Sequence, residues 1–162
     1  MDFSRLDRNR LLLGGISGAL LVVALFLPWY SLSHSDARVE SGAWLCGEGN
    51  YSCSGFDTFP ILRWLLLLFA LSPLILAWIL VRGHKLSWAP GEMTMVAGFS
   101  AMLLMGYNGL LDIPAPDEGL EFGTSLSFGY FIALACTIGI TVTGFLRSQA
   151  GQKRERKAPG TV

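Results

Sequence analysis

The sequence predicts an all-α membrane protein, a four-transmembrane-helix bundle with a small disulfide-braced extracellular β-sheet in the first loop. Hydrophobic residues make up 52% of the 162-residue chain and charged residues only 15%, whereas roughly a quarter of an average soluble domain is charged. The charges lie almost entirely between long apolar blocks. Four of these blocks are long enough to cross a hydrocarbon core, which requires about 20 helical residues.

These blocks form the predicted transmembrane domain, residues 1–146, with helices at about 11–27, 61–81, 93–111 and 126–146. The first block follows three arginines, and a charged start of this kind also occurs in cleaved signal peptides. No small-x-small cleavage site follows, and the block ends in Leu27-Pro28-Trp29-Tyr30. We therefore interpret it as a retained helix that closes in an aromatic belt at a membrane boundary.

The remaining segments are short and have simple interpretations. Arg63, near the outer end of the second helix, can extend its charge to the lipid headgroups. Pro73 predicts a kink in that helix. Pro90 suits the first turn of the third helix, and Glu92 suits its dipole. Residues 147–162 predict a basic cytoplasmic tail without regular structure.

The basic residues predict the orientation, because lysine and arginine concentrate in cytoplasmic segments. Ten of the twelve fall on one side: Arg5, Arg8, Arg10, Arg82, Lys85, Arg147, Lys153, Arg154, Arg156 and Lys157. Only Arg38 and Arg63 fall on the other side, which is rich in acidic residues. We therefore expect both termini in the cytoplasm and a multi-pass protein of the plasma membrane.

The outer first loop, residues 28–60, predicts short strands at Tyr30–His34 and Ala37–Cys46, followed by turn residues before Tyr51. Cys46 and Cys53 lie in this loop on the oxidising side, where a structural disulfide is the expected state. A redox-active pair is the alternative, as in four-helix quinone-linked thiol oxidases. Those enzymes use a Cys-x-x-Cys pair and a second cysteine pair, which this sequence lacks.

No motif in the sequence predicts catalysis, a cofactor or a metal site. His34 and His84 fall on opposite sides of the membrane in this topology, and neither has carboxylates at ligand spacing. Cys136 lies in the middle of the fourth helix and is expected to be a small packing residue. We expect no nucleic-acid partner and find no evident small-molecule substrate.

Small and polar residues mark expected helix contacts. Gly14 and Gly18 form a small-xxx-small pair in the first helix, and Gly139 lies in the fourth. We interpret them as packing sites within the bundle, with a dimer interface as the alternative. Asn108 is expected to hydrogen-bond between helices.

A set of spaced residues resembles the claudin and peripheral-myelin-protein-22 group of four-helix proteins. The sequence signature of that group is a tryptophan after the first helix, followed by Gly-x-Trp and then two cysteines. In this sequence the corresponding residues are Trp29, Gly42, Trp44, Cys46 and Cys53. One residue rather than two separates Trp44 from Cys46. The Leu-Pro-Trp-Tyr ending of the first helix also resembles four-helix proteins of high-GC Gram-positive bacteria. The claudin resemblance implies a helical bundle capped by a small sheet, with lateral self-association or a partner complex.

We therefore expect a non-enzymatic protein that acts through contacts, as a structural or accessory subunit or a lateral self-assembler. Its partners would be membrane lipids and another membrane protein or a second copy of itself. The expected outer contact residues are Tyr30, Tyr51, Phe56, Asp36, Glu40, Glu48, Asp117 and Glu118. An oligomeric, cation-favouring pore lined by these acids is the first alternative, and a membrane thiol oxidoreductase is the second.

Overall fold

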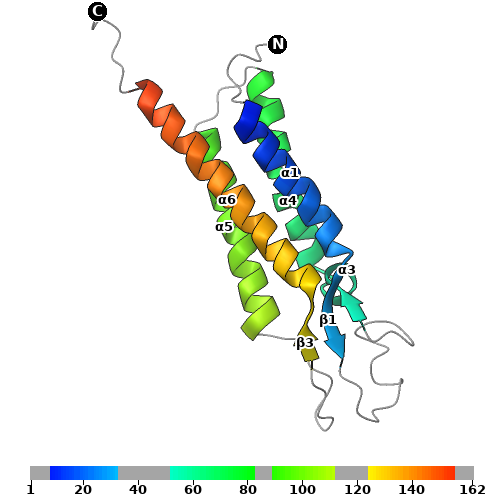
Figure 1. Ribbon diagram of the computed structural model, residues 1–162. Coiled ribbons are helices and arrows are strands. Elements are labelled where there is room, and N and C mark those ends of the chain that lie inside the picture. The colour runs from blue at the N-terminus through cyan, green and yellow to red at the C-terminus, as the bar shows by residue number, and fades with distance from the viewer. Residues whose placement is uncertain (1–7, 33–51, 83–88, 112–123, 156–162) are drawn as a thin grey trace, which may run out of the picture.

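The computed structural model describes residues 8–32, 52–82, 89–111 and 124–155. Within these residues a bundle of long helices carries a small sheet at one end, called here the sheet end (Figure 1). The long helices are α1 (Arg8–Leu25), α4 (Leu62–Val81), α5 (Pro90–Gly106) and α6 (Phe128–Glu155). The short helix α3 (Gly55–Thr58) precedes α4, and α5 continues as the π-helix η2 (Tyr107–Leu111).

The exterior of the bundle is apolar. Among the described residues, three helices are long and apolar enough to cross a membrane: Leu62–Val81, Gly91–Leu111 and Phe128–Ala150. The apolar part of α1, Leu11–Leu25, is shorter. Large apolar side chains are exposed along these helices; Ile61, for example, is 75% exposed. A helical surface of this kind suits contact with lipid, so the helical fold is that of a membrane protein.

Helices α1 and α6 end at other residues than predicted, for local reasons, whereas the start of α5 agrees with the sequence. α1 ends at Leu25 because Phe26 and Leu27 donate to carbonyls three residues back, and Pro28 has no N–H to continue the ladder. α5 begins at Pro90, as the sequence predicts, with Glu92 in its first turn. α6 continues to Glu155, although the segment from residue 147 was expected to lack regular structure. An existing helix propagates easily over arginine, glutamine and lysine, since only its nucleation is costly.

The sheet combines strands from two distant parts of the chain. Strand β1 (Pro28–Leu32) lies between β2 (Ser52–Ser54) and β3 (Thr124–Leu126), and both pairings are antiparallel. The expectation of a sheet built within the first loop is therefore corrected, because β3 comes from the segment that leads into α6. The predicted strand at residues 37–46 lies outside the described residues.

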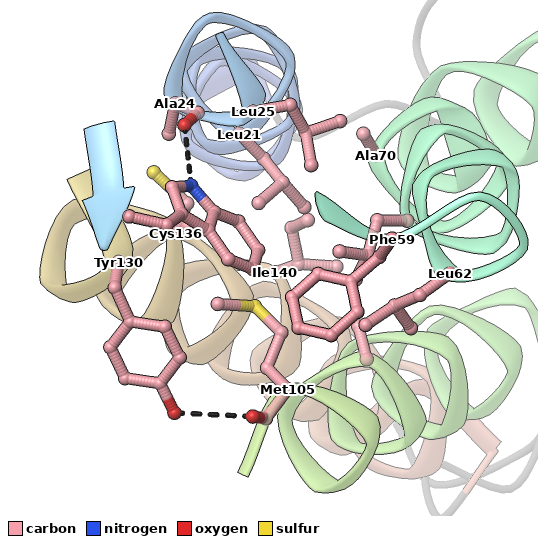
Figure 2. Close-up of a cluster of buried hydrophobic side chains, with 14 of the residues drawn as sticks. Leu21, Ala24, Leu25, Phe59, Leu62, Ala70, Met105, Tyr130, Cys136 and Ile140 are labelled. Carbon is pink, nitrogen blue, oxygen red and sulfur yellow. Dashed lines mark hydrogen bonds between the residues drawn. The ribbon is translucent and has the colours of Figure 1, made fainter. Parts of the chain in front are cut away.

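Helix α6 is the central packing element. It contacts both α5 and α1 extensively, while α4 packs against α1 and α5. The buried core lies between these helices and includes Leu21, Leu66, Met105 and Ile140. Figure 2 shows side chains of the core from α1, α4, α5 and α6 converging in the space between these helices. The core thus connects the helices directly to the sheet end.

Candidate functional site

Two consecutive aromatic residues fix strand β1 on the core. Trp29 and Tyr30 are both fully buried, although neighbouring residues of a regular strand point to opposite faces. The register between β1 and β2 is irregular between Pro28 and Tyr30. A bulge of this kind breaks the alternation, and both rings contact Phe59 at 6.1 Å between centroids. We call Trp29, Tyr30, Phe59 and Tyr130 the aromatic cluster.

Trp29 connects α1 to the segment before α4. Its indole Nε1–H donates to the carbonyl of Ala24 at 2.7 Å, a bond drawn in Figure 2. A side chain on Gly55 would overlap the indole ring, so the first residue of α3 lies directly against it. The edge of Tyr130 meets Trp29 at 5.7 Å between centroids. Trp29, expected in an aromatic belt at the membrane boundary, is therefore a core residue.

The C-terminal end of α5 and the following η2 accept hydrogen bonds from two phenol groups. The helix widens into the π-turns of η2, a change that alters the regular backbone bonding of an α-helix. Tyr130 donates to the carbonyl of Met105 at 3.2 Å (Figure 2), and Tyr30 donates to the carbonyl of Gly109 at 3.4 Å. These side chains come from α6 and β1. The π-helical segment is therefore connected to both the last helix and the central strand.

Burial changes the acid–base chemistry of Tyr30. Removing the phenol from water disfavours its charged form and raises the pKa well above the ordinary value of 10.0, and the nearby Tyr130 adds a smaller contribution in the same direction. Tyr30 therefore stays neutral under ordinary conditions. Its hydroxyl acts as a hydrogen-bond donor in the core.

The sheet brings the ends of two chain segments together. Leu32, which precedes residues 33–51, pairs with Thr124, which follows residues 112–123. Ser31 pairs with Ser52 on the other side of β1, where the first segment returns. The hydroxyls of Ser31 and Ser125 lie 2.7 Å apart and hydrogen-bond across the β1–β3 pair. Both segments therefore start or end on one small sheet.

The predicted outer contact residues divide into three groups. Tyr30, expected to be exposed on the outer surface, is instead fully buried; the bulge in β1 turns its ring inward. Phe56 is half-buried in α3. The others lie outside the described residues: Tyr51, Asp36, Glu40, Glu48, Asp117 and Glu118. The motif residues Gly42, Trp44 and Cys46 also lie outside.

The predicted packing residues lie between helices, with one exception. Gly14 of α1 lies against Thr143 and Pro73, at 3.0 and 3.1 Å from the position of an added Cβ. Gly18 faces the backbone of Ala70 in α4, and Gly139 of α6 faces Ser17. Asn108, expected to bond between helices, donates instead to Leu104 of its own segment at 2.9 Å. The acceptor carbonyl lies one helical turn earlier, in α5.

The cysteines are in different states. Cys53 in β2 is 1% exposed and disulfide-bonded; the expected partner, Cys46, lies outside the described residues. Cys136 is a free, buried thiol in α6. Among the residues that the structure describes, no group of three or more histidine, cysteine or acidic side chains could hold a metal ion.

Three residues of this site were not singled out by sequence reasoning: Gly55, Gly109 and Tyr130. Each makes a contact between residues far apart in the chain, and glycine spacing gives no signal for a contact with an aromatic ring. Tyr130 follows Gly129, whose added Cβ would lie 2.5 Å from the carbonyl of Pro28. The Gly129-Tyr130 pair at the start of α6 was the one sequence feature that could have indicated this close contact.

Comparison of the chain with protein-family models, with curated proteins and with solved structures finds no match. The fold and the apolar exterior therefore define the class to which it belongs: a helical membrane protein with a small three-stranded sheet at one end of the bundle.

Proposed function

We propose that the chain is a four-span protein of the plasma membrane that acts through protein contacts made at its sheet end. The pairing of Leu32 with Thr124 carries this proposal. It places residues that flank two acidic segments, 33–51 and 112–123, side by side on one sheet. In this proposal the two segments would form one composite surface. This surface would contact another membrane protein or a second copy of the chain. An enzymatic role is not part of the proposal.

Helix α1 supports the fourth span through its partners. It packs along α4 and α6, both of which are long enough to cross a membrane. Its apolar part, Leu11–Leu25, extends about 22 Å at 1.5 Å per residue. The half-exposed Ile16 and Val23 give it a lipid-compatible outer face. A short span beside longer ones is tolerated when the bilayer thins or flanking residues extend to its surface.

The composite surface would be acidic and held in shape by covalent and hydrogen bonds. Residues 33–51 contain Asp36, Glu40 and Glu48, and residues 112–123 contain Asp117 and Glu118. A Cys46–Cys53 bridge would shorten the free length of the first segment. The claudin-like spacing of Trp29, Gly42 and Trp44 fits the same architecture. A basic or hydrogen-bonding partner surface would complement these acids.

Native mass spectrometry of the protein extracted gently from its own membrane tests the contact proposal. The loop variant Asp117→Asn/Glu118→Gln removes two negative charges from the composite surface, and Lys153→Gln/Arg154→Gln is the matched control at the opposite end. We expect a defined complex that the loop variant weakens and the control leaves intact. A chain that remains monomeric in every extraction would overturn the proposal. A closed homo-oligomer with cation conductance would favour the pore instead.

Thiol labelling tests the topology separately. In a background that carries Cys46→Ser, Cys53→Ser and Cys136→Ala, one variant adds Ser4→Cys and another adds Ser41→Cys. Each single-cysteine variant would be treated with a membrane-impermeant maleimide on intact cells. We expect labelling at position 41 and none at position 4 until the membrane is opened. Labelling of both positions on intact cells would show that the chain does not place them on opposite sides.

A further inference from the structure

Arg63 lies against two aromatic rings, those of Phe56 and Trp64, at the sheet end of α4. Its guanidinium carbon lies 4.8 Å from the ring centroid of Phe56 and 5.6 Å from that of Trp64. One terminal N–H donates to the carbonyl of Phe56 at 3.2 Å. The Nε atom is buried without a hydrogen-bond partner. The rings therefore position the guanidinium, while most of its donors have no acceptor in the described part of the chain.

The positive charge of Arg63 is not balanced by the described residues. It lies in the first turn of α4, where the helix dipole is also positive and favours an anion rather than a cation. That first turn contains no acidic residue. The carboxylate of Asp57, in the preceding short helix, accepts from the Ser54 hydroxyl at 2.6 Å. Within the described residues, Arg63 makes no ion pair.

Exposed apolar side chains lie next to the rings that contact this charge or beside it along the chain. Phe26 stacks on Phe56 with 4.9 Å between centroids, and Phe56 meets Trp64 at 6.1 Å. Phe26, Trp64 and Ile61 are 61%, 60% and 75% exposed. We call Phe26, Phe56, Ile61, Arg63 and Trp64 the arginine–aromatic cluster. It combines an oriented cation with apolar side chains at the end of a membrane-compatible helix.

We propose that the arginine–aromatic cluster binds the phosphate diester of a phospholipid in the leaflet at the sheet end, with the acyl chains against the exposed apolar side chains. The planar fork of arginine matches the geometry of phosphate oxygens. The helix dipole and the guanidinium attract the anion together. The apolar neighbours select a lipid over free phosphate, because inorganic phosphate gains nothing from them. This site depends on the membrane character of the chain and not on its protein partner.

Arg82, at the other end of α4, provides a comparison within the same helix. Its guanidinium carbon lies 4.4 Å from the ring centroid of Trp78. Arg82 therefore also makes a cation–π contact with a tryptophan. However, it caps the C-terminus of the helix, where the carbonyl dipoles already offset a positive charge. The tighter phosphate site is therefore expected at Arg63.

Native mass spectrometry of the full chain in detergent tests the site with three probes. Dioleoyl-phosphatidylglycerol supplies phosphate and acyl chains, dioleoylglycerol supplies the chains alone, and inorganic phosphate supplies the anion alone. We expect one tightly bound phosphatidylglycerol per chain. Arg63→Gln should weaken its binding about tenfold or more, because it removes charge-assisted hydrogen bonds. Arg63→Lys, which keeps the charge but not the fork, should weaken it less.

The controls separate this site from general attraction between charges. Arg82→Gln removes the same charge from the opposite end of α4 and should leave the affinity within about twofold, a change smaller than one charge-assisted bond would cause. Circular dichroism establishes that each variant is folded, and Arg63→Lys provides the test if Arg63→Gln does not fold. Equal binding to wild type and both Arg63 variants would overturn the proposal. Equal loss in Arg82→Gln, equal affinity for dioleoylglycerol, or displacement of the lipid by millimolar inorganic phosphate would also overturn it.

Discussion

The edge of the Tyr130 ring occupies the space that a side chain on Gly109 would require. The hydroxyl of the same residue donates a hydrogen bond to the carbonyl of Met105, which lies four residues before Gly109 in the α5–η2 segment. Tyr130 is 1% exposed, so its ring lies within the packed core. The width of the π-turn and the position of α6 therefore depend on each other.

Replacing Gly109 with alanine should destabilise the protein by about 1–3 kcal/mol, the usual cost of overpacking a core. The added methyl would overlap the buried Tyr130 ring and press α6 away from η2. The measurement is the free energy of unfolding, from titration with a denaturing detergent in mixed micelles.

Gly106→Ala provides the matched control, three residues earlier. No atom lies within 4 Å of an added Cβ there, and alanine favours a helix over glycine by about 1 kcal/mol. This variant should therefore equal the wild type or exceed it in stability. Similar destabilisation by both substitutions would mean that the Tyr130 contact is not the cause.

The contact between α1 and α4 at Gly18 should be equally sensitive. A Cβ at this position would overlap the carbonyl oxygen of Ala70, and a backbone atom cannot move aside as a side chain can. Gly18→Ala should lower the free energy of unfolding by about 1–3 kcal/mol. At Gly15, an added Cβ would lie 3.6 Å from the flexible end of Leu74, an ordinary contact. Gly15→Ala should therefore be tolerated. A larger loss of stability in Gly15→Ala than in Gly18→Ala would contradict the packing described.

Tyr30 should make stability depend on pH under alkaline conditions. Its folded-state pKa is raised by burial, so the stability that the neutral phenol contributes is fully present below the unfolded pKa of about 10. It is lost as the pH rises through the folded pKa. Unfolding free energies measured from about pH 8 to 11 should therefore fall more steeply for wild type than for Tyr30→Phe. Parallel curves would exclude this effect, and Tyr107→Phe, at an exposed tyrosine, serves as the control.

The proposed disulfide should stabilise the first segment through loop closure. Cys46→Ser should lower the unfolding free energy by about 2 kcal/mol, as expected for a short closed loop. Cys136→Ala, which removes the free thiol of α6, serves as the comparison. If Cys46→Ser leaves the fold intact and abolishes a thiol-exchange activity of the wild type, the oxidoreductase alternative gains support. If neither stability nor activity changes, the bridge has no role.

Long apolar blocks predicted much of the helical architecture because each helix satisfies its own backbone hydrogen bonds in lipid. The second, third and fourth predicted helices correspond to α4, to α5 with η2, and to α6, with shifted ends. Tyr30–His34 was expected as a strand, and β1 covers Pro28–Leu32. These elements arise from local patterns in the chain.

The site was harder to predict because its contacts are not local. β3 is only three residues long, too short for an alternating pattern, and its pairing depends on β1 far away in the chain. The burial of both Trp29 and Tyr30 requires a bulge, which residue composition does not reveal. Asn108 was expected to reach another helix, but its amide donates to the carbonyl of Leu104, four residues earlier.

The β1–β3 pair also affects the order of assembly. Tyr30 is synthesised long before its partner Leu126, and the chain between them contains α4 and α5. Contacts between distant parts of a chain form late, because the loop between them must first be closed. The sheet therefore cannot be completed until β3 has emerged from the ribosome. A chain truncated before β3 would retain its first three long helices but leave one edge of β1 without a partner, a state that quality-control proteases could recognise.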